Sequence, residues 1–305
     1  MACLSYKQVK VQLFERIPQS VVSNIQLFVD KNSPTLWGEK QPRQFLKHMV
    51  ILAHYKDAFK VGFQRLVKNI DFGYKITHKS LQKNIERLRP VIKRWAQTQL
   101  NLGTVHDWNQ AVRNCGLQGE VKEANMWMDS TDFPLEGIKS VSRKSPDWSY
   151  KLNRPGRRYM VLRDGNGKIL KLWGGYSPKV YDGTWLEINK DELENTIPGA
   201  VILADSHFSK GKKLFQNIKF LTNFVVPNKG RKRKRNEENE GENLSVLTKA
   251  QEKFNAAHKQ ARARVESPFG FMKTKIDSLT KPWSESVDQL DCLVWIAAAI
   301  HNKCL

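Results

Sequence analysis

The sequence contains no long uninterrupted hydrophobic run, which argues against a segment that crosses a membrane. Cysteine is scarce as well, and the four residues are scattered without paired spacing: Cys3, Cys115, Cys292 and Cys304. This distribution excludes a disulfide scaffold, indicates a reducing compartment and provides no structural zinc site. The first residues lack the charged-then-apolar pattern of a secretory signal, so we expect none.

Acidic residues are few in relation to basic ones. The 305 residues include 51 Lys and Arg but only 30 Asp and Glu, which gives a formal net charge of +21. The excess is spread along the chain and favours a polyanionic partner, with nucleic acid as the leading candidate. An anionic membrane is the competing partner, but no amphipathic lipid anchor supports it. Hydrophobic residues make up 40% of the chain, as is typical of globular proteins.

Residues 1–110 carry the apolar spacing of helices and are predicted to form an all-helical domain. A short helix at 62–70, a turn and a longer helix capped by Thr77 have the outline of a helix-turn-helix unit. The longer helix carries a repeated basic face of candidate DNA-binding residues: Lys79, Lys83 and Arg87. The alternative is a solvated face on an ordinary helical bundle. Pro90 is expected to kink or interrupt this helix, because it removes a backbone donor.

Residues 111–305 have the pattern of a mixed α/β domain. Two short apolar runs end on an acid, and each is predicted as a buried strand with the acid at its tip: Met126–Asp129 and Val201–Asp205. Between these runs, two strands flank Gly165-Asn166-Gly167, which is a strong hairpin signal, and Asp182 is expected to cap a helix. The elements predict a mixed sheet flanked by helices, in which the two Asp-bearing strands are neighbours.

Glu266 is a third carboxylate, beside the apolar stripe of a helix in the last part of the chain. Basic residues surround it and are candidate DNA-binding residues: Arg262, Arg264 and Lys273. A solvated surface residue is the simpler interpretation of any single Glu on a helix. The two Asp-bearing strands favour a cluster instead, because the helix is expected to pack across the same end of the sheet.

Three carboxylates at one edge of a sheet repel one another unless cations neutralise them. Hard oxygen ligands select Mg²⁺ or Mn²⁺ and leave coordination positions for water and phosphate. Two such ions about 4 Å apart activate an attacking oxygen and stabilise the leaving oxygen of a phosphodiester. The acids and the basic charge therefore both predict a two-metal reaction on a nucleic acid.

Three segments resemble the acidic blocks of the DDE transposases, specifically the PIF/Harbinger-like superfamily: Asp129-Ser-Thr-Asp, Ala204-Asp205-Ser-His-Phe and Arg264-Val-Glu266-Ser-Pro-Phe-Gly-Phe-Met-Lys273. The terminal Ala297-Ala-Ala-Ile-His-Asn302 is similar to the closing helix of that family. The resemblance covers roughly residues 124–305. It implies a ribonuclease H-like fold and a catalytic triad, with the family's acids at Asp129, Asp205 and Glu266. It also implies a homodimer and often a separate Myb-like DNA-binding partner.

Two positions depart from the family pattern. Ser130 stands where Gly is usual, which is a mild change at a strand end. Pro268 follows Glu266 where the family usually continues its helix, and Pro in a helix interior costs about 3 kcal/mol or more. We therefore expect a break, with Ser267 as the cap of a new turn and Pro268 at its first position. Asp132 is expected to face away from Asp129, because the two are three residues apart on one strand.

A low-complexity insert at about 229–243 runs from a basic block into an acidic tract and is predicted to be disordered. Its basic block suits nuclear import or DNA contact, so we expect a nuclear protein. Taken together, the sequence predicts a DDE transposase that cuts double-stranded DNA and joins the 3′-hydroxyl end to a target. Two alternatives stay open: a domesticated DNA-binding protein without catalysis, and a structure-specific nuclease without strand transfer.

Overall fold

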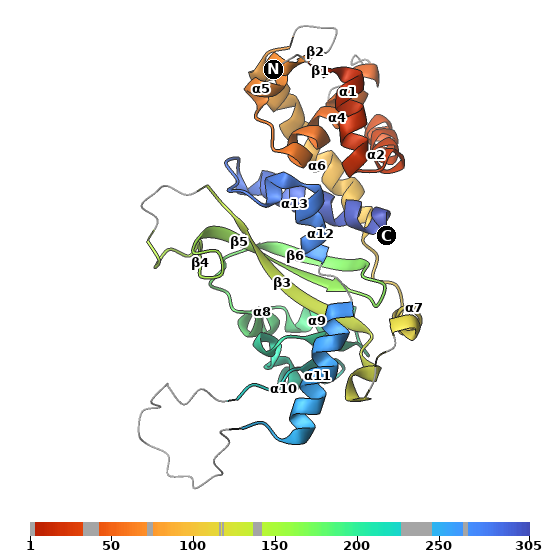
Figure 1. The fold of residues 1–305 in the computed structure, drawn as a ribbon, viewed down its shortest axis with the longest axis vertical. Helices are drawn as coiled ribbons and strands as arrows, with labels where there is room; N and C mark the ends of the chain where they lie inside the picture. The colour runs from red at the N-terminus through yellow and green to blue at the C-terminus, as the bar shows by residue number, and fades with distance from the viewer. Residues whose placement is uncertain are drawn as a thin grey trace.

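The computed structural model of the chain describes residues 4–32, 43–71, 76–115, 117, 119–136, 142–226, 246–264 and 268–305 (Figure 1). The predicted insert at 229–243, the third predicted acid Glu266 and the predicted cap Ser267 lie outside these residues. Within the described residues, the chain folds into a group of N-terminal helices and a mixed sheet with helices on both faces.

The N-terminal part consists of helices with one very small sheet, made of β1 (Leu4–Ser5), α1 (Tyr6–Arg16), α2 (Gln19–Asn32), α4 (Arg43–Phe59), α5 (Phe63–Asn69), β2 (Ile70–Asp71) and α6 (His78–Gln99). The predicted cap is confirmed, because the Thr77 side chain accepts a hydrogen bond from the Ser80 amide. The expectation of helices alone is corrected by β1 and β2, which pair in parallel from Leu4 to Ile70.

Helix α6 continues through Pro90, so of the predicted kink or interruption the interruption does not occur. Pro90 lies on the exposed side of the helix, where its ring does not compete for space in the core. A proline leaves the carbonyl four residues earlier without its usual amide donor. Here the side-chain amide of Gln289 lies 3.4 Å from the Glu86 carbonyl and supplies a replacement donor.

The second part is built on a mixed sheet, as predicted, and this sheet has six strands. After α7 (Val105–Val112) and two short 3-10 turns, η1 (Arg113–Cys115) and η2 (Gly119–Glu123), the strands are β3 (Met126–Pro134), β4 (Trp148–Ser149), β5 (Arg154–Arg163), β6 (Ile169–Tyr176), β7 (Val201–Ala204) and β8 (Lys219–Thr222). The order is β4-β5-β3-β7-β8, and β6 also pairs with β5. β3 is antiparallel to β5 and parallel to β7, so the two Asp-bearing strands are neighbours.

The hairpin between β5 and β6 confirms the Gly165-Asn166-Gly167 signal. Gly167 has a φ of +84°, a left-handed conformation that glycine adopts without strain. A second glycine on this hairpin is required by space: a Cβ on Gly174 would lie 1.8 Å from the ring of the buried Tyr159. The two glycines therefore fix the turn and the close contact between the paired strands.

Helices cover both faces of the sheet (Figure 1). On one face, α12 (Pro268–Lys275) and α13 (Val287–Cys304) pack over β5 and β6, and the short η4 (Asp277–Leu279) connects them. On the same face, α11 (Lys249–Arg264) packs over β3, β7 and β8. The opposite face is covered by α8 (Asp182–Ile188) and α9 (Lys190–Thr196), with η3 (Ser206–Phe208) and α10 (Gly211–Leu214) nearby.

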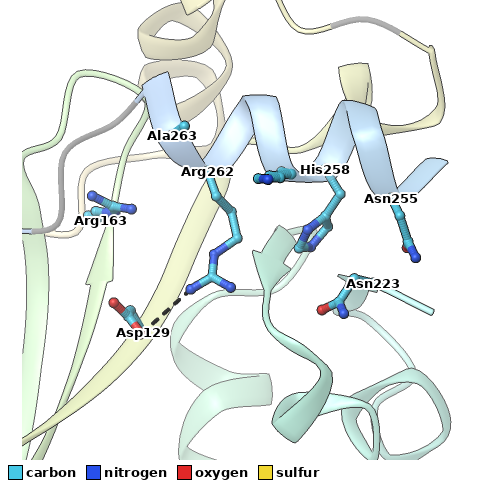
Figure 2. Close-up of a pocket in the computed structure, with 8 residues that line it drawn as sticks. Asp129, Arg163, Asn223, Asn255, His258, Arg262 and Ala263 are labelled. Atoms are coloured by element: carbon cyan, nitrogen blue, oxygen red, sulfur yellow. Dashed lines mark ion pairs between the residues drawn. The ribbon is translucent and has the colours of Figure 1, made fainter. Parts of the chain in front are cut away.

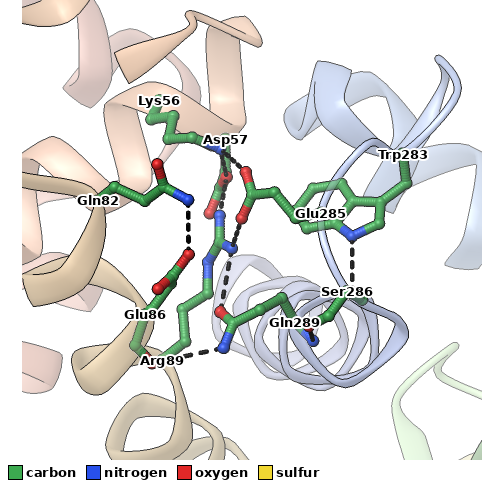
Figure 3. A network of polar contacts seen from close by, with 9 residues as sticks. All are labelled: Lys56, Asp57, Gln82, Glu86, Arg89, Trp283, Glu285, Ser286 and Gln289. Atoms are coloured by element: carbon green, nitrogen blue, oxygen red, sulfur yellow. Dashed lines mark hydrogen bonds and ion pairs between the residues drawn. The ribbon is translucent and has the colours of Figure 1, made fainter. Parts of the chain in front are cut away.

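The N-terminal helices share one hydrophobic core with α12 and α13. Charges are buried at this junction too: Arg89 of α6 is 1% exposed and binds Asp57 of α4 at 2.6 Å and Glu285 at 2.5 Å (Figure 3). Glu285 also binds Lys56 at 2.5 Å, and the Trp283 ring lies 5.1 Å from the Arg89 guanidinium. The division at residues 110 and 111 remains a prediction, and the packing shows that the two parts are firmly joined.

Candidate active site

The two predicted Asp residues belong to, or directly follow, neighbouring strands of the sheet. In the parallel pair of β3 and β7, Met126 is opposite Ile202 and Trp127 is opposite Leu203. Asp129 and Asp205 each follow the last of these pairs by two residues, and β7 itself ends at Ala204, so the extrapolated register would bring the two acids level with one another. Neighbouring strands are about 4.8 Å apart, so the two residues share the carboxyl edge of β7.

The prediction that both acids end their strands holds for only one of them. Asp205 follows the last residue of β7, but Asp129 lies inside β3, which continues to Pro134. The reason is that β5 pairs with β3 along almost its whole length, from Trp127 to Pro134. Asp129 is thus held by a strand that extends beyond its parallel neighbour.

Asp129 faces the side of the sheet on which α11 and α12 lie. Alternate residues of a strand share a face, and Trp127 packs beneath α11 while the Phe133 ring meets Phe269 of α12 edge-on at 6.2 Å. Asp129 therefore lies between these two helices. Helix α12 begins with Pro268 at its first position, as predicted, and the residues of the predicted break lie outside the described part of the chain.

Both carboxylates are anchored to the backbone through one oxygen. Asp129 Oδ1 accepts the Ser130 amide at 2.9 Å, and Asp205 Oδ1 accepts the His207 amide at 2.9 Å. Asp205 thereby caps η3, and His207 is an exposed turn residue. Both Asp side chains are partly exposed, so they are fixed in position and still accessible from solvent.

A cavity of about 510 Å³ opens beside Asp129, between α11 and the edge of the sheet (Figure 2). We call it the α11 cavity and define it by the residues that line it: Asp129, Arg163, Asn223, Asn255, His258, Lys259, Arg262 and Ala263. Figure 2 shows the Arg262 guanidinium pointing from α11 into the space between Asp129 and His258. Its nearest nitrogen is 3.9 Å from Asp129 Oδ1, an ion pair that is longer than a hydrogen bond.

Burial lowers the pKa of two residues in the α11 cavity. It lowers the pKa of Arg163 to about 10, although the negative charge of Asp129 opposes the change, and Arg163 stays protonated at neutral pH. Burial also lowers the pKa of His258, so this side chain is neutral at neutral pH. His258 Nε2 lies 2.8 Å from the Ala204 carbonyl oxygen and so carries the ring proton.

Further cations lie along β3 beyond Asp129. Lys273 of α12 donates to the Thr131 hydroxyl at 3.3 Å, and Lys151 donates to the Ser130 carbonyl at 3.1 Å. Burial lowers the pKa of Lys273, and the positive charge of Lys151 lowers it further. Asp129 is therefore flanked by basic residues on both sides.

The structure brings two of the predicted DNA-binding residues near Asp129, namely Arg262 and Lys273. The side chain of Arg264 lies outside the described part. The residues of the predicted basic face are exposed: Lys79, Lys83 and Arg87. The helix that carries them, α6, lies on the side of α13 away from the sheet (Figure 1).

Asp132 faces the opposite side of the sheet, as predicted, and has a structural role. It is 1% exposed, accepts two hydrogen bonds from Arg158 at 2.8 and 3.2 Å, and accepts a third from Ser149 at 2.6 Å. Asp182 does not cap its helix, which corrects that prediction, because Tyr181 holds the cap position and makes no side-chain cap. Asp182 is buried 3.6 Å from Arg158, and burial raises its pKa while Arg158 opposes the change.

Sequence reasoning missed Arg163, His258 and Lys151. Two of them left a signal in the periodicity. Arg163 lies two residues after Val161 on one strand and therefore faces inward, although Arg usually marks the solvent side. His258 occupies a buried position of α11, four residues after Phe254. Lys151 lies in an irregular segment, where no periodicity indicates direction.

The carboxylates suit the divalent cations that the sequence predicts. Asp129 and Asp205 supply hard oxygen donors at adjacent positions, and Mg²⁺ is typically held by one or two protein carboxylates with water and phosphate. Among the described residues, no group of three His, Cys, Asp or Glu side chains could hold a metal ion. Glu266 lies outside that part of the chain, so the complete triad stays a prediction.

A family model described as DDE superfamily endonuclease matches residues 128–302. The match covers more than half of the chain and includes Asp129 and Asp205, so the chain belongs to the DDE superfamily endonuclease family. Endonucleases of this superfamily act on DNA and generally use divalent metal ions. No curated protein and no solved structure matches the chain. None of the helices in the described residues has the length and hydrophobicity needed to span a membrane.

Proposed function

We propose that the chain is a DDE transposase of the PIF/Harbinger-like type, with a ribonuclease H-like catalytic fold. Its reaction is hydrolysis of a DNA phosphodiester followed by attack of the released 3′-hydroxyl on target DNA. The observation that carries the proposal is the parallel β3–β7 register, in which Trp127 pairs with Leu203 two residues before each of the two acids. Both acids lie within the region that matches the endonuclease family.

In this proposal Asp129, Asp205 and Glu266 hold two Mg²⁺ or Mn²⁺ ions. The ions supply an activated oxygen nucleophile and stabilise the leaving oxygen. The backbone hydrogen bonds to Asp129 and Asp205 fix one oxygen of each carboxylate in advance. The cations around Asp129, including Arg262 and Lys273, attract the negatively charged backbone of the substrate.

The remaining assignments follow from the same proposal. Arg262, Arg264 and Lys273 contact the DNA at the catalytic domain, residues 111–305. Residues 1–110 contribute a helix-turn-helix-like contact through the exposed face of α6, which carries Lys79, Lys83 and Arg87. The protein acts in the nucleus as a homodimer, with a separate Myb-like DNA-binding protein as a further partner.

The proposal is tested with the purified full chain and a DNA duplex in Mg²⁺ or Mn²⁺. Asp129→Asn, Asp205→Asn and Glu266→Gln are each expected to abolish cleavage, because each removes a negatively charged oxygen ligand. The matched control is Asp191→Asn, a change of an exposed acid on α9, which is expected to cleave like the wild type. Wild-type cleavage by Glu266→Gln would exclude that residue as the third ligand.

The same assay separates the alternatives when a second duplex is present as the target. A transposase joins the cut 3′-end to this duplex, and the joined product is detected by sequencing. A structure-specific nuclease gives cut ends without joined product, and a domesticated protein binds DNA without cutting it. The proposal is rejected by either of these two outcomes under conditions that support binding.

A further inference from the structure

We propose that the α11 cavity binds backbone phosphates of the DNA strand next to the bond that is cut. The inference rests on the proposed function, because it takes Asp129 as the position of the reacting phosphodiester. It adds Arg163 and Lys259, which the sequence did not predict as DNA-binding residues, to the residues that contact the substrate. The cavity is continuous with Asp129, so a strand with its reacting phosphate at the acids extends directly into it.

The charge of the α11 cavity suits a phosphate. Three cationic side chains, Arg163, Lys259 and Arg262, line it, and Asp129 is the one acid among its lining residues in the described part of the chain. Arg163 keeps its proton in spite of burial, since its lowered pKa of about 10 is still well above neutral pH. A lining with three cations and one acid among its described residues attracts the negative charge of a phosphate.

Arg262 is placed to serve a ligand as well as Asp129. Its guanidinium is 3.9 Å from the carboxylate, too far for a hydrogen bond, and its side chain is 34% exposed. A guanidinium carries five N–H donors and binds phosphate in a planar, two-point arrangement. Arg262 can therefore turn toward a phosphate in the α11 cavity with little loss of its present contacts.

The walls of the α11 cavity are held in place before any ligand binds. His258 Nε2 contacts the Ala204 carbonyl at 2.8 Å and the Leu221 carbonyl at 3.3 Å, which joins α11 to the ends of β7 and β8. Asn255 exchanges two hydrogen bonds with the backbone of Phe224, at 2.8 and 2.9 Å. Such a site loses little conformational entropy on binding.

The lining favours the DNA backbone over the bases. Single-stranded bases are usually held by stacking on aromatic rings. No Phe, Tyr or Trp is among the described residues that line the α11 cavity. The Asn255 amide is already used by Phe224, which leaves it unsuited to reading a base edge. We therefore infer phosphate binding that does not depend on sequence.

Two cavity residues and one outside residue of α11 provide a matched experiment. Lys259→Gln and Arg262→Gln remove charges from the cavity, and Lys253→Gln removes an exposed charge from the same helix outside it. Binding of a fluorescent mixed-sequence duplex is measured by anisotropy in EDTA over a range of salt concentrations. Each cavity variant is expected to weaken binding about three- to tenfold at about 0.1 M salt. The reason is that a variant with one phosphate contact fewer releases fewer counterions from the DNA when it binds.

The salt dependence gives the sharper result. The double variant Lys259→Gln/Arg262→Gln is expected to lower the slope of log affinity against log salt by about two, whereas Lys253→Gln leaves it unchanged. Equal behaviour of the cavity variants and Lys253→Gln would overturn the inference. Circular dichroism melting curves identify any variant that has lost its fold. If Arg262→Gln does so, the test rests on Lys259→Gln, whose position is exposed.

A mixed-sequence duplex in which a run of backbone phosphates is replaced by neutral methylphosphonates tests the contact from the DNA side. The replacement is expected to weaken binding by the wild type but to have little further effect on the double variant. Equal weakening in both proteins would overturn the inference. Because this measurement needs no cleavage, it separates the two proposals. If the wild type does not cut DNA but the cavity variants bind DNA more weakly, the phosphate site is supported and the transposase is rejected. If the wild type cuts DNA but the cavity variants bind as well as the wild type, the transposase is supported and the phosphate site is rejected.

Discussion

Two arginines of this protein face carboxylates in opposite ways. Arg89 is 1% exposed, lies 2.6 Å from Asp57 and 2.5 Å from Glu285, and has Gln289 at 3.1 Å. Arg262 is 34% exposed at the side chain and lies 3.9 Å from a single carboxylate, Asp129. Burial alone would lower the pKa of Arg89, but the two acids raise it above its ordinary value.

The difference separates a structural charge from one that is available to a ligand. At the junction of α4, α6 and the start of α13, the positive and negative side chains satisfy one another, and little remains for a partner. Among the described residues that line the α11 cavity, three are positive and one is acidic, and the ion pair of Arg262 with Asp129 is too long for a hydrogen bond. Charge number is therefore a weaker guide to a binding site than the degree to which the charges are already paired.

The largest effect that tests this comparison is expected from Arg89→Met. The change leaves Asp57 and Glu285 in a buried site without their guanidinium, and breaking such a pair costs about 3–5 kcal/mol. The free energy of unfolding is measured with urea at pH 7. The control is Arg87→Met, a change of an exposed residue on the same helix, which should lie within about 0.5 kcal/mol of the wild type. A loss of less than 1 kcal/mol for Arg89→Met would contradict a structural role.

A smaller effect is expected from pH at the same junction. His54 of α4 is buried, and burial lowers its pKa to about 4, with Asp57 opposing and Arg89 adding to the change. The unfolded chain binds a proton near pH 6.5 that the folded chain takes up only near pH 4. The stabilisation is therefore complete above pH 6.5 and decreases as the pH falls toward 4.

From pH 7 to pH 5 this difference amounts to about 2 kcal/mol. His54→Leu is expected to lose about that much less stability than the wild type over the same pH range. Urea unfolding at the two pH values measures the difference, and His106→Leu, at an exposed position, serves as the control. Identical pH dependence of His54→Leu and the wild type would show that His54 is not the source.

The smallest effect is expected at the other arginine. Arg262→Gln removes a positive charge close to Asp129 and should raise the affinity for Mn²⁺, measured by calorimetry without DNA. Arg262 is about one third exposed, so solvent screens it, and the gain is expected to be about fivefold, the equivalent of about 1 kcal/mol. Lys253→Gln is the control for total charge. If both variants bind Mn²⁺ equally, Arg262 does not compete for Asp129.

Local patterns predicted much of the fold. The Thr77 cap, the Gly165-Asn166-Gly167 hairpin and the helix start at Pro268 depend on short-range geometry, and all three are confirmed. The interruption at Pro90 and the cap at Asp182 were predicted wrongly because distant residues decide the roles of these side chains. Gln289, almost two hundred residues away, reaches the carbonyl that Pro90 leaves unpaired, and Arg158 lies against Asp182 inside the protein.

The candidate site was predictable only in part for a similar reason. Acids that follow apolar runs could be recognised, and the mixed sheet then made Asp129 and Asp205 neighbours. The length of β3 could not be recognised, because its polar residues beyond Asp129 are buried by helices and paired with β5. Arg163 and His258 belong to the site through burial, which arises only when α11 packs on the sheet.

The core shared by the N-terminal helices and α13 also has a consequence for biosynthesis. Arg89 and its partner Glu285 are 196 residues apart in the chain. At about 5–20 residues per second, the ribosome makes the second partner about 10–40 s after the first. During this interval the nascent helices expose the apolar surface that α13 later covers, and Arg89 lacks its partner Glu285. Chains that expose such surface are prone to aggregate. We therefore expect the protein to need chaperone protection during translation, and its N-terminal helices to be the last part to reach their final stability.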